Sequence, residues 1–295
     1  MVERGPTVFL QQLINGITQG SLFALLAISF SLVWGLLKLV NFALGEVYMF
    51  GAFTGWLIFT YWVENLAVAL LASIVVGWVL GWLIEKVAFK ALRGVPHIAS
   101  LVCTIGFSFF LKESAAAIFG VETKAMPAFL SESAFTLAGA NVSWLQILMI
   151  ALAALMLLIL QFLFYRTRIG LGVRAVSLDY RTAGLMGINV DRVISVAFSL
   201  SGAIAAFVGV LAAVYYNAVN PTMGFIPGLK GFTAAVFGGI TSIPGAILGG
   251  YLLGIIENLG VQFISSGYRD LISFGILIVF LLLRPNGILG KKAKL

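Results

Sequence analysis

Long runs of apolar residues constrain this chain more than any other feature of its sequence. A helix needs about 20 mainly apolar residues to cross the hydrocarbon core of a bilayer. Runs that are long enough, or nearly so, lie at residues 9–37, 41–62, 66–85, 96–119, 143–165, 193–216, 243–262 and 268–283. We therefore expect an all-α polytopic membrane protein with about eight full transmembrane helices.

The composition excludes ordinary soluble enzymes and disordered chains. Hydrophobic residues make up 61% of the 295 residues and charged residues only 10%, whereas soluble domains carry about 45–50% and about 25%. His97 and Cys103 are the only residues of their types. We expect no His- or Cys-based metal site, no catalytic residue and no cofactor bound by this chain.

The net charge of +7 is distributed as in a membrane protein rather than as in a nucleic-acid-binding protein. Lys and Arg gather in the loops of one side, as they do in cytoplasmic loops. These basic residues are Lys38, Lys86, Lys90, Arg93, Arg166, Arg168, Arg174, Arg181, Arg192, Arg284, Lys291, Lys292 and Lys294. The opposite loops carry Glu64, Glu122, Glu132 and Asp270. This asymmetry predicts that the N-terminus lies outside and the C-terminus in the cytoplasm.

A further apolar segment, Gly231–Ile240, is about half as long as a crossing helix requires. The three full runs after the loop at 166–192 would leave the basic tail outside unless another segment also crosses. Irregular backbone at membrane depth survives only where it is buried in protein or lines a cavity. We therefore expect residues 229–241 to form a broken half-helix that faces the interior, as in transporters. A re-entrant hairpin or simple packing is the alternative.

Pairs of glycines four residues apart mark helix faces on which two backbones can touch. Such pairs are Gly16/Gly20, Gly51/Gly55, Gly77/Gly81, Gly245/Gly249 and Gly250/Gly254. They predict a compact bundle and an obligate membrane partner. Packing within the chain alone is the other interpretation of the same pattern.

Polar residues inside the first run predict an inward-facing helix surface. Gln12, Asn15 and Gln19 lie on one face of a helix, and an amide in hydrocarbon needs a partner or water. This face either lines a substrate path or joins helices. Lys230, just before the half-helix, is a candidate to hold its entrance or to meet an anionic group.

Charged residues also interrupt three other runs. A charge at the centre of a membrane helix is costly, so we expect Glu46, Lys112, Glu113 and Glu257 in the outer or inner third, where long side chains reach the interface. Lys112 and Glu113 are expected to pair between helices.

The loop at 166–192 is too long for a simple hairpin between helices. Ser177 is a plausible N-cap, Asp179 suits a helix start and Gly187 a C-cap, which predicts a short helix at about 178–186. Leu178 and Leu185 then form part of an apolar strip that suits docking on a soluble partner. A solvated loop is the alternative. The chain has no phosphate-binding Gly-x-x-x-x-Gly-Lys-Ser/Thr motif, so any nucleotide is bound by another chain.

Six segments that together run nearly from end to end of the chain carry a family resemblance. They are QQLINGITQGSLFALLAISFSLVWG, NFALGEVYMFGA, TIGFSFFLKE, RAVSLDYRTAGLMGINVDRVI, NPTMGFIPGLKGFTAAVFGGITSIPGAILGGYLLGIIE and RPNGILG. With these segments the chain resembles the LivH-type membrane permease subunit of bacterial branched-chain amino-acid ABC importers. The stretch Gly228–Gly254 is the most specific. Leu44 departs from the family, which usually has His in the NFAHG box, so any role of that imidazole is absent here. Lys112 and Glu113 replace an uncharged pair.

The resemblance implies a single transmembrane permease domain over residues 1–295 in the bacterial inner membrane. It also implies a second related permease subunit or a second copy, two cytoplasmic ATPases that bind ATP and Mg²⁺, and a periplasmic or surface substrate-binding protein. An ion-coupled secondary transporter, or an ABC permease for urea or short amides, is the alternative.

The same resemblance assigns candidate residues to two sites. The loop at 166–192 would couple to an ATPase, through Arg174, Asp179, Arg181, Ala183, Gly187 and Arg192. The half-helix and the box at 41–55 would border the translocation path. Candidates for this path are Gln12, Asn15, Gln19, Asn41, Glu46, Lys230, Gly231, Gly238 and Gly239.

Overall fold

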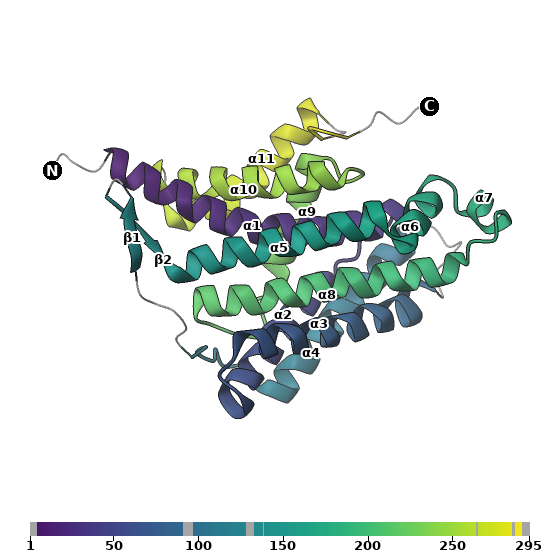
Figure 1. Cartoon of the computed structure of the whole chain (residues 1–295), viewed down its shortest axis with the longest axis horizontal. Coiled ribbons are helices and arrows are strands. Elements are labelled where there is room, and N and C mark those ends of the chain that lie inside the picture. Colours follow the sequence, from purple (N-terminus) through teal and green to yellow (C-terminus); the bar gives the residue numbers. More distant parts are fainter. Residues whose placement is uncertain are drawn as a thin grey trace. The chain divides into compact units, whose positions relative to one another are not determined.

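The computed structural model describes residues 5–90, 97–127, 133–137, 139–263, 265–284 and 287–290. Its helices, drawn in Figure 1, are α1 (Gly5–Leu37), α2 (Leu44–Leu57), α3 (Leu66–Ile84), α4 (His97–Phe119), α5 (Trp144–Arg166), α6 (Arg168–Leu178), α7 (Tyr180–Leu185), α8 (Val190–Tyr216), α9 (Phe225–Gly238), α10 (Ile243–Phe263) and α11 (Arg269–Leu283). The basic-tail residues Lys291, Lys292 and Lys294, together with Arg93 and Glu132, lie outside the described part of the chain.

Seven helices of the described chain are long and apolar enough to cross a membrane. The predicted run at 41–62 forms the 14-residue helix α2, which a π-helical turn at Ile58–Trp62 continues. The prediction of an all-α polytopic membrane protein is confirmed. The expected half-helix is also present, as the short apolar helix α9, but it begins at Phe225 rather than at residue 229.

One small element was not expected from the sequence. Strands β1 (Ser133–Leu137) and β2 (Ala140–Ser143) pair antiparallel, with Phe135 opposite Val142. The turn between them contains Gly139 at φ +85°, a backbone conformation that glycine adopts without steric cost.

The chain divides into two compact units, and neither is continuous in sequence. One unit consists of Met1–Ile28, Ala128–Met156 and Lys230–Leu295, and the other of Ser29–Pro127 and Leu157–Leu229. We call them unit 1 and unit 2. Helices α1, α5 and α9 each contribute residues to both units.

In unit 2, helices α2 and α3 pack on α8, as Figure 1 shows. Gly51 of α2 lies against the backbone of Ala206, and Gly77 of α3 lies against that of Gly202. The absence of a side chain at these positions lets the helix backbones come into contact, which is how membrane helices associate closely.

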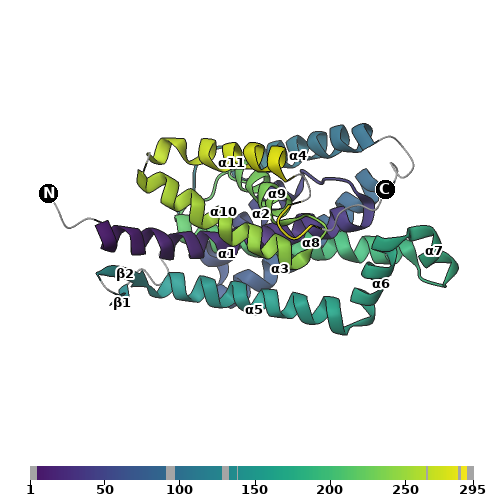
Figure 2. The same ribbon diagram turned by 90° about the horizontal axis from the view of Figure 1, so that it is seen from above.

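In unit 1, α1 and α10 lie side by side, and Figure 2 shows α10 next to α11 as well. A Cβ added at Gly16 would lie 2.8 Å from Cα of Ile255, and one added at Gly20 would lie 2.9 Å from Cα of Tyr251. The remaining glycine pairs also meet helices of their own unit. The five pairs therefore act in packing within the chain, and they do not by themselves argue for a membrane partner.

This packing predicts different outcomes for two glycines of the same helix. Gly20→Ala should lower the thermal unfolding temperature in detergent, because its Cβ meets the backbone of Tyr251, and overpacking costs about 1–3 kcal/mol. Gly35→Ala is the matched control, since beyond its own helical turn no atom of the described residues lies within 4 Å of its added Cβ. Equal unfolding temperatures for the two variants would contradict the role assigned to Gly20.

Candidate functional site

A buried ion pair joins the half-helix to its neighbours in unit 1. Nζ of Lys230 on α9 lies 3.0 Å from Oε1 of Glu257 on α10 and 2.7 Å from Oδ1 of Asp270 on α11. The side chains of Lys230 and Glu257 are 5% and 0% exposed, whereas that of Asp270 is 54% exposed. The half-helix is thus tied to two longer helices by opposite charges.

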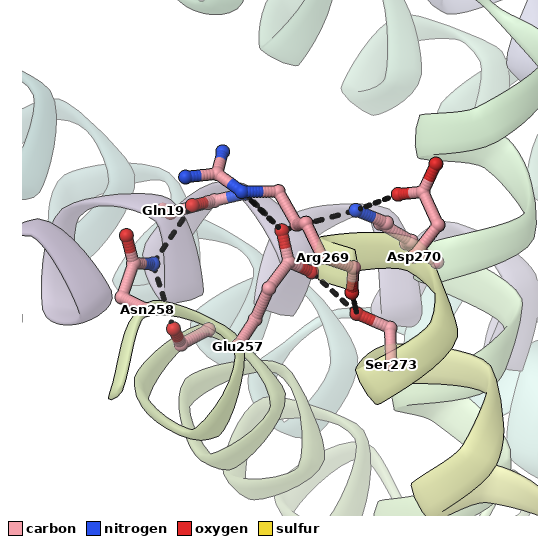
Figure 3. Close-up of polar contacts among 8 residues, drawn as sticks. Gln19, Glu257, Asn258, Arg269, Asp270 and Ser273 are labelled. Carbon is pink, nitrogen blue, oxygen red and sulfur yellow. Dashed lines mark hydrogen bonds and ion pairs between the residues drawn. The ribbon is translucent and has the colours of Figure 1, made fainter. Parts of the chain in front are cut away.

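Glu257 is the centre of a wider network, shown in Figure 3. Its Oε1 also accepts a hydrogen bond from Nε2 of Gln19 at 3.0 Å and lies 3.5 Å from Nε of Arg269, while its Oε2 accepts from the hydroxyl of Ser273 at 2.6 Å. Nδ2 of Asn258 donates to Oε1 of Gln19 at 2.8 Å. We call Gln19, Lys230, Glu257, Asn258, Arg269, Asp270 and Ser273 the Glu257 network.

The Glu257 network contains two cations and two carboxylates, so its formal charges balance. A buried charge without a partner is strongly destabilising, and here each buried charge has one. One sequence expectation was wrong, because Lys230 lies inside α9 rather than before it. Glu257 is enclosed by protein, and its position in the outer or inner third of the membrane stays a prediction. A lone Lys and a lone Glu in neighbouring apolar segments were the signal that could have predicted the pair.

The other amides of α1 form a separate polar group in unit 1. Oδ1 of Asn15 accepts from Nε2 of Gln146 at 2.9 Å and from Nε2 of Gln11 at 3.3 Å. Gln11 in turn exchanges hydrogen bonds with the backbone of Asn141. Here the amides join helices, and Gln12, which is half-buried, belongs to neither group.

The candidate glycines Gly231 and Gly238 of α9, and Gly239 directly after it, are buried. Two of them contact backbone. Gly238 lies against Gly245 of α10, and Gly239, at φ +113°, lies against Gly290. Gly231 is buried within the helix. Residues 287–290 cover the end of α9, because the N–H groups of residues 288 and 289 donate to the carbonyls of residues 237 and 238 at 3.1 and 2.9 Å. These bonds satisfy carbonyls that a helix end leaves free.

Glu46 and Asn41 lie at the start of α2 in unit 2. Both are buried, with 2% and 1% of their surface exposed, and the expected position of Glu46 in the outer or inner third of the membrane stays a prediction. Oε1 of Glu46 accepts from the hydroxyl of Ser108 on α4 at 3.2 Å. Oδ1 of Asn41 accepts from the N–H of Ala43 at 3.2 Å. Neither Oε2 of Glu46 nor Nδ2 of Asn41 has a hydrogen-bond partner among the described residues.

Lys112 and Glu113 do not pair between helices in the described structure. They form an ion pair of 3.5 Å with each other, as neighbours on α4, and their side chains are partly to largely exposed. Such an exposed pair contributes about 0–1 kcal/mol to stability.

The loop at 166–192 forms two helices rather than one. Helix α6 runs to Leu178, and the extended backbone of Asp179 separates it from α7. Asp179 is the N-cap of α7, since its carboxylate accepts from the N–H of Arg181 at 2.9 Å and from the hydroxyl of Thr182 at 2.6 Å. Ser177 is not a cap. It lies in the last turn of α6, where its hydroxyl donates to the carbonyl of Arg174.

The other end of α7 is closed as expected. Gly187 has φ +85°, its N–H donates to the carbonyl of Gly184, and the N–H of Ile188 donates to the carbonyl of Ala183, both at 3.1 Å. This pair of bonds defines the Schellman motif, in which glycine adopts the left-handed conformation. Ala183 is the buried residue of α7. The helix is therefore short but closed at both ends.

The surface of this loop is apolar and basic. Leu178, Leu185 and Met186 are 89%, 88% and 78% exposed. The guanidinium of Arg174 lies 5.5 Å from the ring centre of Tyr165 on α5. The side chains of Arg181 and Arg192 are also exposed, the latter in the first turn of α8. This surface has the composition of a docking site for another protein.

Comparison with known proteins identifies the family. Residues 12–281 match the family model described as branched-chain amino acid transport system / permease component. The chain is 39% identical to the high-affinity branched-chain amino acid transport system permease protein BraD of Pseudomonas aeruginosa, over 96% of each chain. It is 38% identical to the permease protein LivH of Escherichia coli K12, again over 96% of each.

A probable branched-chain amino acid transport permease protein LivH of Methanocaldococcus jannaschii is 29% identical, over 94% of this chain and 91% of that protein. No solved structure shows a significant match. The resemblance seen in the sequence is confirmed, and this multi-pass membrane protein belongs to the family of permease components of branched-chain amino acid transport systems.

Proposed function

We propose that this chain is the permease subunit of an ATP-driven importer of branched-chain or related amino acids. It acts in the bacterial inner membrane, with the N-terminus outside and the C-terminus in the cytoplasm. Its partners are a second related permease subunit or a second copy, two ATPases that bind ATP and Mg²⁺, and a substrate-binding protein on the outer side. The observation that carries this proposal is the exposed, capped helix α7.

Helix α7 fits the role of a coupling element. Isolated helices of six residues are unstable in water, but α7 is closed by the Asp179 cap and by the Schellman motif at Gly187. Leu185 and Met186 at its end are largely exposed, which favours a groove on a soluble partner. ATP binding and hydrolysis on that partner then bias two conformations of the permease that differ by a few kcal/mol.

The experiment that tests this function is reconstitution of the complex co-purified from the native host. The proteoliposomes contain the permease, its ATPases and the co-purified binding protein. L-leucine should accumulate in the compartment that the ATPases face, and only when that compartment contains ATP. Uptake driven by an ion gradient in the absence of the ATPases would contradict the proposal and favour a secondary transporter. Ligand binding to the co-purified binding protein separates amino acids from urea and short amides.

A prediction about Asp179 separates its role as the cap of α7 from any role of its negative charge. Asp179→Asn should preserve substrate-stimulated ATP hydrolysis, because Asn caps helices about as well as Asp, whereas Asp179→Ala should reduce it severalfold. The hydrogen bonds from the Thr182 hydroxyl and the Arg181 N–H hold the pKa of the Asp179 carboxyl below its usual value. The ionised cap is therefore present at and above the ordinary carboxyl pKa, and it is lost only when pH falls through the lowered value.

Protonation of Asp179 should therefore cause no loss of coupled ATPase activity between pH 6 and 8, because this range lies well above carboxyl pKa values of about 4. If Asp179→Asn uncouples as strongly as Asp179→Ala, the carboxylate charge acts on the partner and the capping explanation fails.

The Glu257 network predicts how firmly α9 is held. Lys230→Met should destabilise the protein by about 3–5 kcal/mol, because it leaves the carboxylates of Glu257 and Asp270 without their shared cation. Thermal unfolding in detergent measures the effect. Glu113→Gln, which breaks the exposed pair on α4, is the control and should change stability by less than about 1 kcal/mol. Similar unfolding temperatures for both variants would show that Lys230 does not anchor α9.

A further inference from the structure

The carboxylate of Glu46 is buried but only half satisfied. Its Oε1 accepts from Ser108, and its Oε2 has no donor among the residues that the structure describes. Buried polar atoms in native proteins are nearly always hydrogen-bonded, so an exception points to a missing group. The contrast with Glu257 is informative, because that carboxylate is equally buried and has partners on both oxygens.

The backbone beside this free oxygen carries no side chain. A Cβ added at Gly224 would lie 2.8 Å from Oε2 of Glu46, and one at Gly228 would lie 2.9 Å from Cα of Gly45. The glycines bring the start of α9 onto the start of α2, and Oε2 of Glu46 is buried beside Gly224. A side chain at position 224 would collide with Oε2 and with the backbone of Gly45.

A free hydrogen-bond donor lies at the same helix start. Nδ2 of the buried Asn41 has no acceptor within the described residues, although its Oδ1 caps the N–H of Ala43. The start of α2 thus presents one unused acceptor with negative charge and one unused donor. An α-amino acid carries the complementary groups, an ammonium that only donates and a carboxylate that only accepts.

We propose that Oε2 of Glu46 binds the protonated amine of the transported amino acid, with the Ser108 hydroxyl fixing the orientation of the carboxylate. This rests on the proposed function, which makes an amino acid the cargo. The Glu46 carboxylate then compensates for the hydration that the ammonium loses when it leaves solvent. A metal ion is a weaker match, because the described residues contain no group of three or more His, Cys, Asp or Glu side chains.

Thermal unfolding of the permease–ATPase complex in nanodiscs, without the substrate-binding protein and with added ligands, tests this assignment. The probes are L-leucine, 3-methylbutylamine, which keeps the amine alone, and 4-methylpentanoate, which keeps the carboxylate alone. Leucine and the amine should raise the unfolding temperature of the wild type and of the control Glu113→Gln, whose exposed carboxylate lies on α4. In Glu46→Gln, which keeps the shape but removes the charge, both shifts should disappear. Ser108→Ala, a second variant that leaves the charge in place, should at least halve the leucine shift.

Several results would overturn the proposal. These are a leucine shift that survives in Glu46→Gln, a 4-methylpentanoate shift as large as that of the amine, or the absence of any shift in the wild type, which would mean that water fills the site. A shift that depends on Glu46 and that sodium produces without an amine would identify a metal-cation site instead. ATP-dependent uptake is measured separately, so failure of the importer function is distinguishable from failure of the amine site.

Discussion

Close contact between helix backbones is the constraint on which this structure depends. Lipid tails are as apolar as the side chains they touch, so membrane helices gain little from hiding apolar surface from water and associate through packing and polar contacts. In unit 2, glycines of α2 and α3 meet the backbone of α8, and in unit 1 glycines of α1 meet that of α10. Both units therefore bring helices together through contacts at glycine, and the buried polar groups lie among these helices.

The buried carboxylates of Glu257 and Glu46 are satisfied to different degrees. In unit 1 the Glu257 carboxylate receives donors from α1, α9 and α11, and the charges balance. In unit 2 the Glu46 carboxylate receives one donor from α4, and its Oε2 has none among the described residues. Since an unsatisfied buried group weakens a protein, the first arrangement is that of an anchor and the second that of a group reserved for a ligand.

The sequence was sufficient to predict the membrane class, the helix runs, the half-helix and the presence of a helix in the loop at 166–192. These features depend on local hydrophobicity and on glycine spacing, which a sequence shows directly. Details that depend on a distant partner were missed. The sequence around Glu46 gives no sign of its bond to Ser108, and the pairing of Lys230 with Glu257 is indicated only by a lone charge in each of two neighbouring apolar segments.

Local capping was only partly predictable, for a related reason. The end of α7 needs a residue in the left-handed backbone conformation, which favours glycine, and Gly187 was predicted there correctly. Ser177 and Asp179 are both good caps, and the choice between them depends on where α6 ends. The hairpin of β1 and β2 was missed because two strands of five and four residues carry a weak sequence signal.

The contacts of α9 have a mechanical consequence for unit 1. Its C-terminal end accepts hydrogen bonds from residues 288 and 289, and Lys230 in its second turn is held by α10 and α11. Tilting this part of α9 alone would break these ion pairs and hydrogen bonds. A rearrangement that preserves them moves Lys230–Gly238 together with α10, α11 and residues 287–290.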